Sequence, residues 1–452
     1  MEFTKQTRLR GEITVPGDKS ISHRSVMFGA IASGLTEVTN FLQGADCLST
    51  ISCFRQMGIT IENTTDKILV RGNGLHGLTS ANTTLDVGNS GTTIRLLSGI
   101  LAGQSFSSTI TGDSSIQKRP MDRIIAPLTK MGADIQSIAG NAAYSTCVSG
   151  NAAYSACITD NTCSAYSAFA PLEINGRSLT GISYQTPVAS AQIKSCLLLA
   201  GLYADTPTTV IEPALSRNHT ELMLSGFGAT LTTSANHTAT ILPNPALEGI
   251  KIDVPGDISS AAYFIVAGLI TPHSEILIKN VGVNPTRAGI IKVCQMMNAD
   301  ITLLNMRYAG GEPVADIFVR YTPNLTGCVI EGDMIPTLID EIPIIAVMAA
   351  LAQTQTVIRN AEELKVKESN RLEITYNHLT AMGADITATN DGMMIEGNAT
   401  FHGNTLDSFD DHRIAMAFAV AGINASGITN MMGAECVNIS YPNFYQDLQN
   451  LY

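Results

Sequence analysis

Three short segments in the first half of this 452-residue chain place cations beside residues that could bind an anion. Lys19, Ser20 and Arg24 stand at the start of an apolar, helix-like run, and i,i+4 spacing puts Ser20 and Arg24 on one face. Arg119 and Arg217 lie in loop-like segments. Each segment alone is equally typical of a helix cap or a solvated surface. Taken together, they predict a site for anionic ligands.

The second half of the chain adds acids to its cations. The segment 367–371 (Lys-Glu-Ser-Asn-Arg) places an acid between two cations, and a helical start would aim all three at one place. Such a field keeps a carboxylate ionised until a substrate rearranges the charges, which is how a proton donor or acceptor is tuned. Asp340 precedes one strongly apolar helix-like run, and His412 and Arg413 precede another. Helix capping and exposed ion pairs are the alternatives for these segments.

The segment 85–97 is typical of a strand, a glycine-rich turn and a helix start. Gly88 and Gly91 would let the backbone approach an anion, and the helix would present its first N–H groups to it. Tight packing between strand and helix explains this segment alone equally well. No G-x-x-x-x-G-K-[ST] segment occurs, which argues against a nucleotide P-loop.

These clusters lie where predicted elements end, which is where clefts form. Acids able to move protons accompany only the cations of the second half. The arrangement predicts two anionic substrates held between two domains, with acid–base groups between them.

Two internal repeats predict the scaffold that positions the clusters. The sequence Val15-Pro-Gly-Asp18 recurs as Val254-Pro-Gly-Asp257, each time before a helix-like apolar run. A second pattern, a helix-like run ending in a Met-Gly or related turn and then a short strand, recurs five times, about 70 to 95 residues apart. A sixth helix is expected at 414–422. The spacing predicts small βαβ-like units, three in each of two similar domains, with the boundary just before Val254.

Composition excludes several classes of partner. A net charge of −12 argues against nucleic acid and anionic membranes. The apolar runs fall short of the ~20 residues that a membrane helix needs. Nine cysteines without a C-x-x-C pair or secretory leader predict reduced thiols in the cytoplasm, and their spacings match no zinc pattern. The near-literal repeats within 141–170 predict a low-complexity insertion at the surface.

Six motifs together resemble the 5-enolpyruvylshikimate-3-phosphate synthase family of enolpyruvyl transferases. They are P-G-D-K-S-I-S-H-R at 16–24, G-N-S-G-T-T-I-R at 88–95, R-P-M at 119–121, A-S-A-Q at 189–192, V-K-E-S-N-R-L at 366–372 and D-H-R at 411–413. The resemblance covers nearly the whole chain apart from 141–170. It implies an α/β (α+β) fold of two similar domains, each with three βαβαββ repeats around a pseudo-threefold axis. Residues 1–18 with 254–452 would form domain I, residues 19–253 domain II, and the hinge would lie near residues 18 and 254.

The resemblance also implies an activity and its residues. The enzyme would transfer the enolpyruvyl group of phosphoenolpyruvate to the 5-hydroxyl of shikimate 3-phosphate and release phosphate, without metal or organic cofactor and as a monomer. Shikimate 3-phosphate would be bound by Lys19, Ser20, Arg24, Ser190, Ala191, Gln192, Arg217, Asp340 and Lys367. Phosphoenolpyruvate would be bound by Lys19, Asn89, Gly91, Arg119, Gln192, Arg371, His412 and Arg413. The catalytic residues would be Lys19, Asp340, Lys367 and Glu368, with Glu368 moving the proton at the methylene carbon and Asp340 or Lys367 deprotonating the 5-hydroxyl.

Three positions depart from the family pattern or select within it. Ile439 stands where better-known members carry a phosphate-binding lysine, so Arg119 would carry more of that contact. Ala191 stands where many members have a second serine, and Arg217 would compensate for the lost phosphate donor. Gly91 is the small residue of glyphosate-sensitive members, which predicts competition between glyphosate and phosphoenolpyruvate.

Other functions fit less well. The sister transferase for UDP-N-acetylglucosamine carries a reactive cysteine five residues before the equivalent of Arg119, where this chain has Ser114. A non-catalytic anion-binding protein of the same fold would have lost the proton-handling groups Asp340, Lys367 and Glu368. A nucleotide-dependent ligase or cyclase would need a nucleotide-binding loop that the chain lacks.

Overall fold

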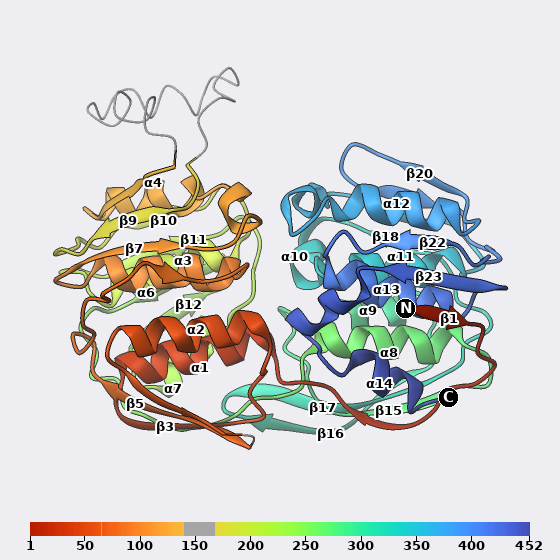
Figure 1. The fold of residues 1–452 in the computed structure, drawn as a ribbon, viewed down its shortest axis with the longest axis horizontal. Helices are drawn as coiled ribbons and strands as arrows, with labels where there is room; N and C mark the ends of the chain where they lie inside the picture. Colours follow the sequence, from red (N-terminus) through yellow and green to blue (C-terminus); the bar gives the residue numbers. More distant parts are fainter. Residues whose placement is uncertain (65, 140–167) are drawn as a thin grey trace.

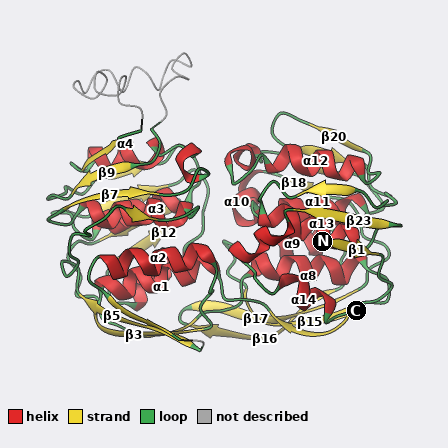
Figure 2. Ribbon diagram, in the orientation of Figure 1, coloured by secondary structure: helices red, strands yellow, loops and turns green. Residues whose placement is uncertain are grey.

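The computed structural model describes residues 1–64, 66–139 and 168–452. Figure 1 shows two halves side by side, with both termini in the right-hand half. Each half combines helices with small sheets rather than one large sheet (Figure 2). No helix within the described ranges is long and apolar enough to cross a membrane. The insertion expected at 141–170 falls almost entirely on residues 140–167, outside the described residues.

The left-hand half contains three four-stranded sheets among its described residues, ordered β14-β3-β5-β4, β6-β7-β9-β8 and β10-β11-β13-β12. Its helices are α1 (Lys19–Ile31), α2 (Ala45–Gln56), α3 (Gly91–Ala102), α4 (Asp122–Lys130), α6 (Ala191–Gly201) and α7 (His219–Gly226). Its strands are β3 (Ser33–Thr39), β4 (Thr60–Asn63), β5 (Lys67–Asn73), β6 (Leu85–Asp86), β7 (Ser107–Thr111), β8 (Asp134–Ser137), β9 (Leu172–Asn175), β10 (Ser183–Gln185), β11 (Thr208–Ile211), β12 (Leu231–Ser234), β13 (Thr238–Ile241) and β14 (Lys251–Asp253).

The right-hand half repeats this plan with sheets ordered β16-β17-β15-β2, β18-β19-β21-β20 and β1-β23-β22. Its helices are α8 (Ile258–Ile270), α9 (Gly289–Met296), α10 (Ile335–Leu338), α11 (Ile342–Ala350), α12 (Arg371–Ala381), α13 (His412–Gly422) and α14 (Phe444–Gln449). Its strands are β1 (Glu2–Thr4), β2 (Arg10–Thr14), β15 (Glu275–Gly282), β16 (Ile301–Ala309), β17 (Glu312–Arg320), β18 (Val329–Ile330), β19 (Thr356–Ile358), β20 (Ile386–Ala388), β21 (Met393–Ile395), β22 (Thr405–Asp407) and β23 (Ile428–Met432). The predicted fold, three similar units in each of two halves, is confirmed.

The two Val-Pro-Gly-Asp copies pair with each other where the chain passes between the halves. Gly17 and Gly256 form an antiparallel bridge. The amide of Asp18 donates to the carbonyl of Pro255 over 2.8 Å, and the amide of Asp257 donates to that of Pro16 over 2.9 Å. Both aspartates also cap the helices that follow, α1 and α8, through their carboxylates. The duplicated motif therefore builds a symmetric crossing and starts one long helix on each side.

The recurring turn after each amphipathic helix adopts the conformation that its glycine predicts. Gly58 follows α2 with φ +87°, and Gly383 follows α12 with φ +98°. In the degraded copy after α9, Asn298 takes this place with φ +57°. Glycine adopts this left-handed conformation at the lowest cost and asparagine is the usual substitute at helix ends, so these positions end the helices and let the chain enter the next strand.

The core is divided in the same way as the repeats. Among the described residues, one cluster of buried apolar side chains runs from Ile21 to Val254. The other combines residues between Phe3 and Val15 with residues between Ile258 and Leu451. Strand β2 accordingly pairs with β15, and β1 with β23. The domain boundaries at residues 18 and 254 stay a prediction, and this division of the core supports them.

Candidate active site

A cavity of about 380 Å³ lies between the two halves and draws its lining from both. Most of the residues singled out in the sequence line it. They are Lys19, Ser20, Gly91, Arg119, Ser190, Ala191, Gln192, Arg217, Asp340, Lys367, Glu368, His412 and Arg413. Segments almost 400 residues apart in sequence therefore meet in one cleft.

Helices α1, α3, α6 and α13 each begin at this cleft. Helix α1 begins at Lys19, and α13 begins at His412. Helix α3 begins at Gly91 after Ser90, whose side chain accepts from the amide of Thr93. Helix α6 begins after Ser190, which caps it in the same way. The N-terminus of a helix carries unsatisfied N–H groups and partial positive charge, so the cleft attracts anions through its backbone as well as its cations.

Lys19 is held by a carboxylate that the sequence did not single out. Its Nζ lies 2.6 Å from Asp46 in α2. Burial lowers the pKa of Lys19, but the neighbouring Asp46 more than offsets this, and the resulting pKa is raised above its ordinary value. Lys19 is therefore a permanent cation fixed at the start of α1.

Asp340 is the point at which cations of both halves meet. Its carboxylate is paired with Arg217 from the left-hand half, and with Arg371 at 3.2 Å and Arg413 at 3.7 Å from its own half. Burial raises its pKa, but Arg413 and Arg217 outweigh burial and hold the pKa well below its usual range. Asp340 is ionised at neutral pH.

Glu368 is the second acid of the cleft. It is paired with Arg371 and lies 3.6 Å from Arg119 of the other half. Burial raises the pKa of Glu368, but Arg371 and Arg119 bring it well below its usual range. In this structure Glu368 is a carboxylate whose charge depends on two guanidinium groups. An anion bound by those two groups would offset their positive charge and so raise the pKa of Glu368.

Lys367 differs from the other cations. Burial lowers its pKa, and Asp340 opposes that shift without cancelling it. A lysine with a lowered pKa can accept a proton more readily near neutral pH than an ordinary lysine can. Lys367 and Glu368 precede α12, which begins only at Arg371, so the helical alignment expected for residues 367–371 is wrong. Asn370 caps α12 instead, and a bend at residues 367–369 brings Lys367 and Glu368 close to Arg371.

Three residues expected at the substrates do not line the cavity. Arg24 is buried, with its guanidinium donating to Thr220, Ser195 and the carbonyl of Ser20. Arg371 is buried behind Asp340 and Glu368, where Asp411 also accepts from it at 2.7 Å. Asn89 lies in the glycine-rich turn, half-buried. Their direct contacts with substrates stay predictions.

The capping explanation of Asp340-Glu341 is wrong. Glu341 precedes α11 but makes no side-chain cap. It is buried and pairs with Arg287 at 3.1 Å, and Ser259 also donates to it. Asp411, in contrast, does cap α13 by accepting from the amide of Arg413.

Several cleft residues were not identified from the sequence. They are Asp46, Thr92, Arg95, Arg123, Ser216, Arg287 and Glu363. Arg95 donates to Gln192 and to the carbonyl of Pro120 at 3.3 Å. Arg123 pairs with Glu363 across the cleft at 2.7 Å. The hydroxyl of Ser216 has no hydrogen-bond partner among the described residues. Thr92 and Arg95 carried a sequence signal, since both lie in the motif at 88–95.

The three departures have different settings. Ala191 lines the cleft directly after the cap residue Ser190. A Cβ on Gly91 would lie 3.0 Å from Nη1 of Arg119, so this glycine leaves room for that guanidinium. Ile439 is half-buried and packs against the right-hand core, and it does not line the cavity.

His412 is buried, lines the cleft, and its ring nitrogens have no partner in the described ranges. Burial, then Lys19 and Arg413, lower its pKa well below its usual range, so the ring is neutral. No group of three or more metal-ligating side chains occurs in the part of the chain that the structure describes.

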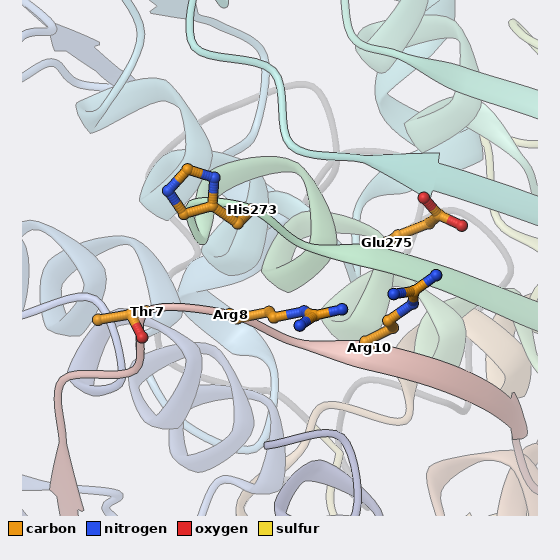
Figure 3. Close-up of a pocket in the computed structure, with 5 residues that line it drawn as sticks. All are labelled: Thr7, Arg8, Arg10, His273 and Glu275. Carbon is orange, nitrogen blue, oxygen red and sulfur yellow. The ribbon is translucent and has the colours of Figure 1, made fainter.

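A second, shallow surface depression lies elsewhere, between the start of β2 and the turn before β15. Figure 3 shows its lining, Thr7, Arg8, Arg10, His273 and Glu275. It shares no residue with the cleft and contains none of the residues singled out in the sequence.

Comparisons with known proteins identify the same family that the sequence motifs resemble. The family model described as EPSP synthase (3-phosphoshikimate 1-carboxyvinyltransferase) matches residues 3–168 and 160–448. A protein named 3-phosphoshikimate 1-carboxyvinyltransferase from Thermoanaerobacter sp. (strain X514) is 52% identical over 451 residues, covering 100% of both chains. One of the same name from Desulforudis audaxviator is 50% identical over 452 residues, covering 100% of this chain and 99% of the other.

Solved structures extend the likeness to the fold. EPSP synthase from Acinetobacter baumannii is 42% identical with a TM-score of 0.84, and the match covers 100% of this chain and 97% of the other. The enolpyruvyl transferase NikO from Streptomyces tendae, at 15% identity and a TM-score of 0.75, shares the fold over 100% of this chain and 96% of its own. The chain therefore belongs to the EPSP synthase (3-phosphoshikimate 1-carboxyvinyltransferase) family, as its motifs predict.

Proposed function

We propose that this protein transfers the enolpyruvyl group of phosphoenolpyruvate to the 5-hydroxyl of shikimate 3-phosphate and releases phosphate, a step of aromatic amino-acid biosynthesis. Family membership supports the reaction. The single observation that carries it at the level of residues is the placement of Asp340, Lys367 and Glu368 between cations of both halves. This arrangement suits two anionic substrates that must exchange protons.

The acceptor would bind mainly to the left-hand half. Ser190 and Arg217 are suited to its phosphate, because a serine hydroxyl, a helix N-terminus and a guanidinium all donate to phosphate oxygens. Lys19 and Ser20 at the start of α1 extend this surface, and Arg24 behind them is proposed to face the carboxylate. Asp340 would accept hydrogen bonds from the ring hydroxyls.

The donor would bind where the two halves approach each other. Arg119 and Arg413 line the cleft, with Arg371 directly behind Glu368. Gln192 is oriented by Arg95 and Thr92, which places its amide beside the glycine-rich turn. These groups would hold the phosphate and carboxylate of phosphoenolpyruvate and withdraw charge from the reacting carbon.

The chemistry needs one proton removed from the 5-hydroxyl and one delivered to the methylene carbon. Lys367, with its lowered pKa, is proposed as the main base, and Asp340 orients it and the hydroxyl. The hydroxyl oxygen forms a bond to the central carbon of the donor while Glu368, protonated once the donor occupies Arg371 and Arg119, protonates the methylene. The tetrahedral intermediate then loses phosphate as Glu368 takes back a methyl proton, which restores the carbon–carbon double bond.

The test is phosphate release from purified protein given phosphoenolpyruvate alone, shikimate 3-phosphate alone, and both. Release that needs both substrates, and that falls about 10²–10⁴-fold in Glu368→Gln, is expected. Binding of both substrates without release would contradict the activity. Release at the wild-type rate in Glu368→Gln would contradict the role of Glu368.

The proposal extends to a monomer of the cytoplasm that is a target of glyphosate. The described cysteines are all free thiols, which suits a reducing compartment. Light scattering on the eluting protein measures the oligomeric state directly, and a mass of twice 47.9 kDa would contradict the monomer.

A further inference from the structure

A buried group of charges lies behind the acceptor side of the cleft. Lys194, in α6, has its Nζ 2.8 Å from Glu212 and 2.8 Å from Glu221 in α7. The side chains of Lys194 and Glu212 are 1% and 0% exposed. Neither residue lines the cavity, so neither could touch a substrate bound there.

Glu212 joins two turns that do line the cavity. One carboxylate oxygen accepts from the amide of Ser190 at 3.2 Å, and the other accepts from the amide of Ser216 at 3.4 Å. Lys194 donates to the carbonyl of Ser216 at 3.3 Å. The pair thus holds the turn that begins α6 and the turn that presents Arg217 at a set separation.

The charges in this group are balanced, which a buried site requires. Lys194 neutralises Glu212, and Arg24 supplies a second positive charge near Glu221. Burial lowers the pKa of Arg24 to about 10, and Glu221 is the group that most opposes this shift. Arg24 also donates to Ser195 of α6 and to Thr220 of α7, so both helices are fixed to α1 as well.

The separation of the two turns matters because the acceptor's phosphate would be shared between them. Ala191 provides no hydroxyl, so the side chains proposed for the phosphate are Ser190 in one turn and Arg217 in the other. A phosphate bound by donors from two turns is sensitive to their spacing, since hydrogen-bond strength falls steeply with misalignment.

We propose that Lys194 and Glu212 are positioning residues that set the spacing of these two turns and thereby let the protein favour shikimate 3-phosphate over unphosphorylated shikimate. The inference rests on the proposed function, because it takes shikimate 3-phosphate as the acceptor. It assigns the selectivity for a phosphate to two residues that do not touch it.

The test compares the affinities for shikimate and shikimate 3-phosphate by calorimetry. The variant is the double substitution Lys194→Met and Glu212→Gln, which removes one positive and one negative charge and leaves Glu221 with Arg24 as the nearby cation. The measure is the dissociation constant for shikimate divided by that for shikimate 3-phosphate. This ratio is expected to fall roughly tenfold or more, because charge-assisted hydrogen bonds no longer hold the two turns. The single variant Glu212→Gln keeps the volume of the side chain but replaces the carboxylate that accepts from the amides of Ser190 and Ser216. A smaller fall in the ratio is expected for this variant.

Leu198→Ala is the matched control. Leu198 is buried one turn further along α6 and makes no part of the charge group, so its truncation lowers the melting temperature and leaves the ratio unchanged. A ratio that stays at the wild-type value in both the double variant and Glu212→Gln overturns the inference. A ratio that falls equally in Leu198→Ala also overturns it, because any loosening of α6 would then suffice.

Failure of the proposed function would be seen separately, in the wild-type protein. Wild-type protein that binds the two acceptors equally, or that releases no phosphate with both substrates, would contradict the function before any variant is examined. Normal wild-type turnover with an unchanged ratio in the variants would contradict only the positioning role.

Discussion

The guanidinium of Arg217 pairs with the carboxylate of Asp340, although 123 residues and the boundary between the two halves separate them. Arg217 lies in the turn before α7, and Asp340 precedes α11. The pair joins the side of the cleft proposed to hold the acceptor's phosphate to the group proposed to hold its ring hydroxyls. Arg217 and Asp340 therefore orient each other only when the two halves are in this relative position.

Replacing Arg217 should weaken acceptor binding selectively. In Arg217→Met we expect the KM for shikimate 3-phosphate to rise about 10–100-fold, since a hydrogen bond to a charged group contributes about 1.5–3 kcal/mol. The KM for phosphoenolpyruvate should change much less. Arg177→Met is the control, because Arg177 forms an exposed pair with Asp134 in the same half. Steady-state kinetics with each substrate varied in turn decides, and equal changes in both KM values would contradict the assignment.

The pH dependence should identify Lys367 as a base. Its pKa lies below the ordinary 10.5, and it must lose its proton to act, so kcat/KM should rise with pH up to that pKa. Asp340 raises the pKa of Lys367, so Asp340→Asn should move this rise to lower pH while reducing kcat. Lys367→Arg keeps the charge but is not a base at these pH values, and should lose about 10²–10⁴-fold in kcat. A rise at the same pH in wild type and Asp340→Asn would contradict the assignment.

The sequence could predict where the helices that carry cleft residues begin, because helix starts carry local signals. Asp18 and Asp257 precede apolar runs and do cap α1 and α8. The repeated turns predicted three units per half because each requires a left-handed residue such as Gly58. Local signals of this kind depend on a few neighbouring residues and survive in a single sequence.

The partners of those residues could not be predicted in this way. Asp46 and Arg123 belong to helices whose sequences are ordinary. Asp46 meets Lys19 because α2 packs against α1 in the same unit, and Arg123 meets Glu363 because the two halves face each other across the cleft. The true start of α12 did carry a signal, since the amide of Glu373 is capped by Asn370 three residues earlier.

Gly91 should control the response to glyphosate. A Cβ at this position would meet Nη1 of Arg119 at 3.0 Å and Nη1 of Arg95 at 3.5 Å, so an alanine must displace flexible side-chain ends and narrow the donor site. We expect glyphosate to compete with phosphoenolpyruvate in the wild type. Gly91→Ala should raise the inhibition constant more than the KM for phosphoenolpyruvate. An inhibition titration without competition, or equal changes in both constants, would contradict this prediction.

His23 is a buried group whose protonation should limit stability in acid. Its Nδ1 lies 2.7 Å from Oγ1 of Thr50, which lies 2.7 Å from Oγ1 of Thr93 at the glycine-rich turn. Its Nε2 has no partner among the described residues. Burial is the main cause that lowers the pKa of His23 to about 3, and the nearby Asp46 does not reverse it.

The sign of the effect follows from which state binds the proton. Between pH 6.5 and about 3 the unfolded chain holds a proton on His23 and the folded protein does not, so stability falls as pH falls through this window. Each pH unit within this window lowers the free energy of unfolding by up to about 1.4 kcal/mol. Above pH 6.5 the effect is absent because His23 is neutral in both states. His23→Gln keeps a hydrogen-bonding side chain but cannot titrate. Its free energy of unfolding should therefore gain about 2–3 kcal/mol relative to wild type between pH 6.5 and 4.5, measured by urea unfolding. Neighbouring carboxylates titrate in both proteins and cancel in the comparison, so a difference that stays constant with pH would show that His23 does not carry the acid sensitivity.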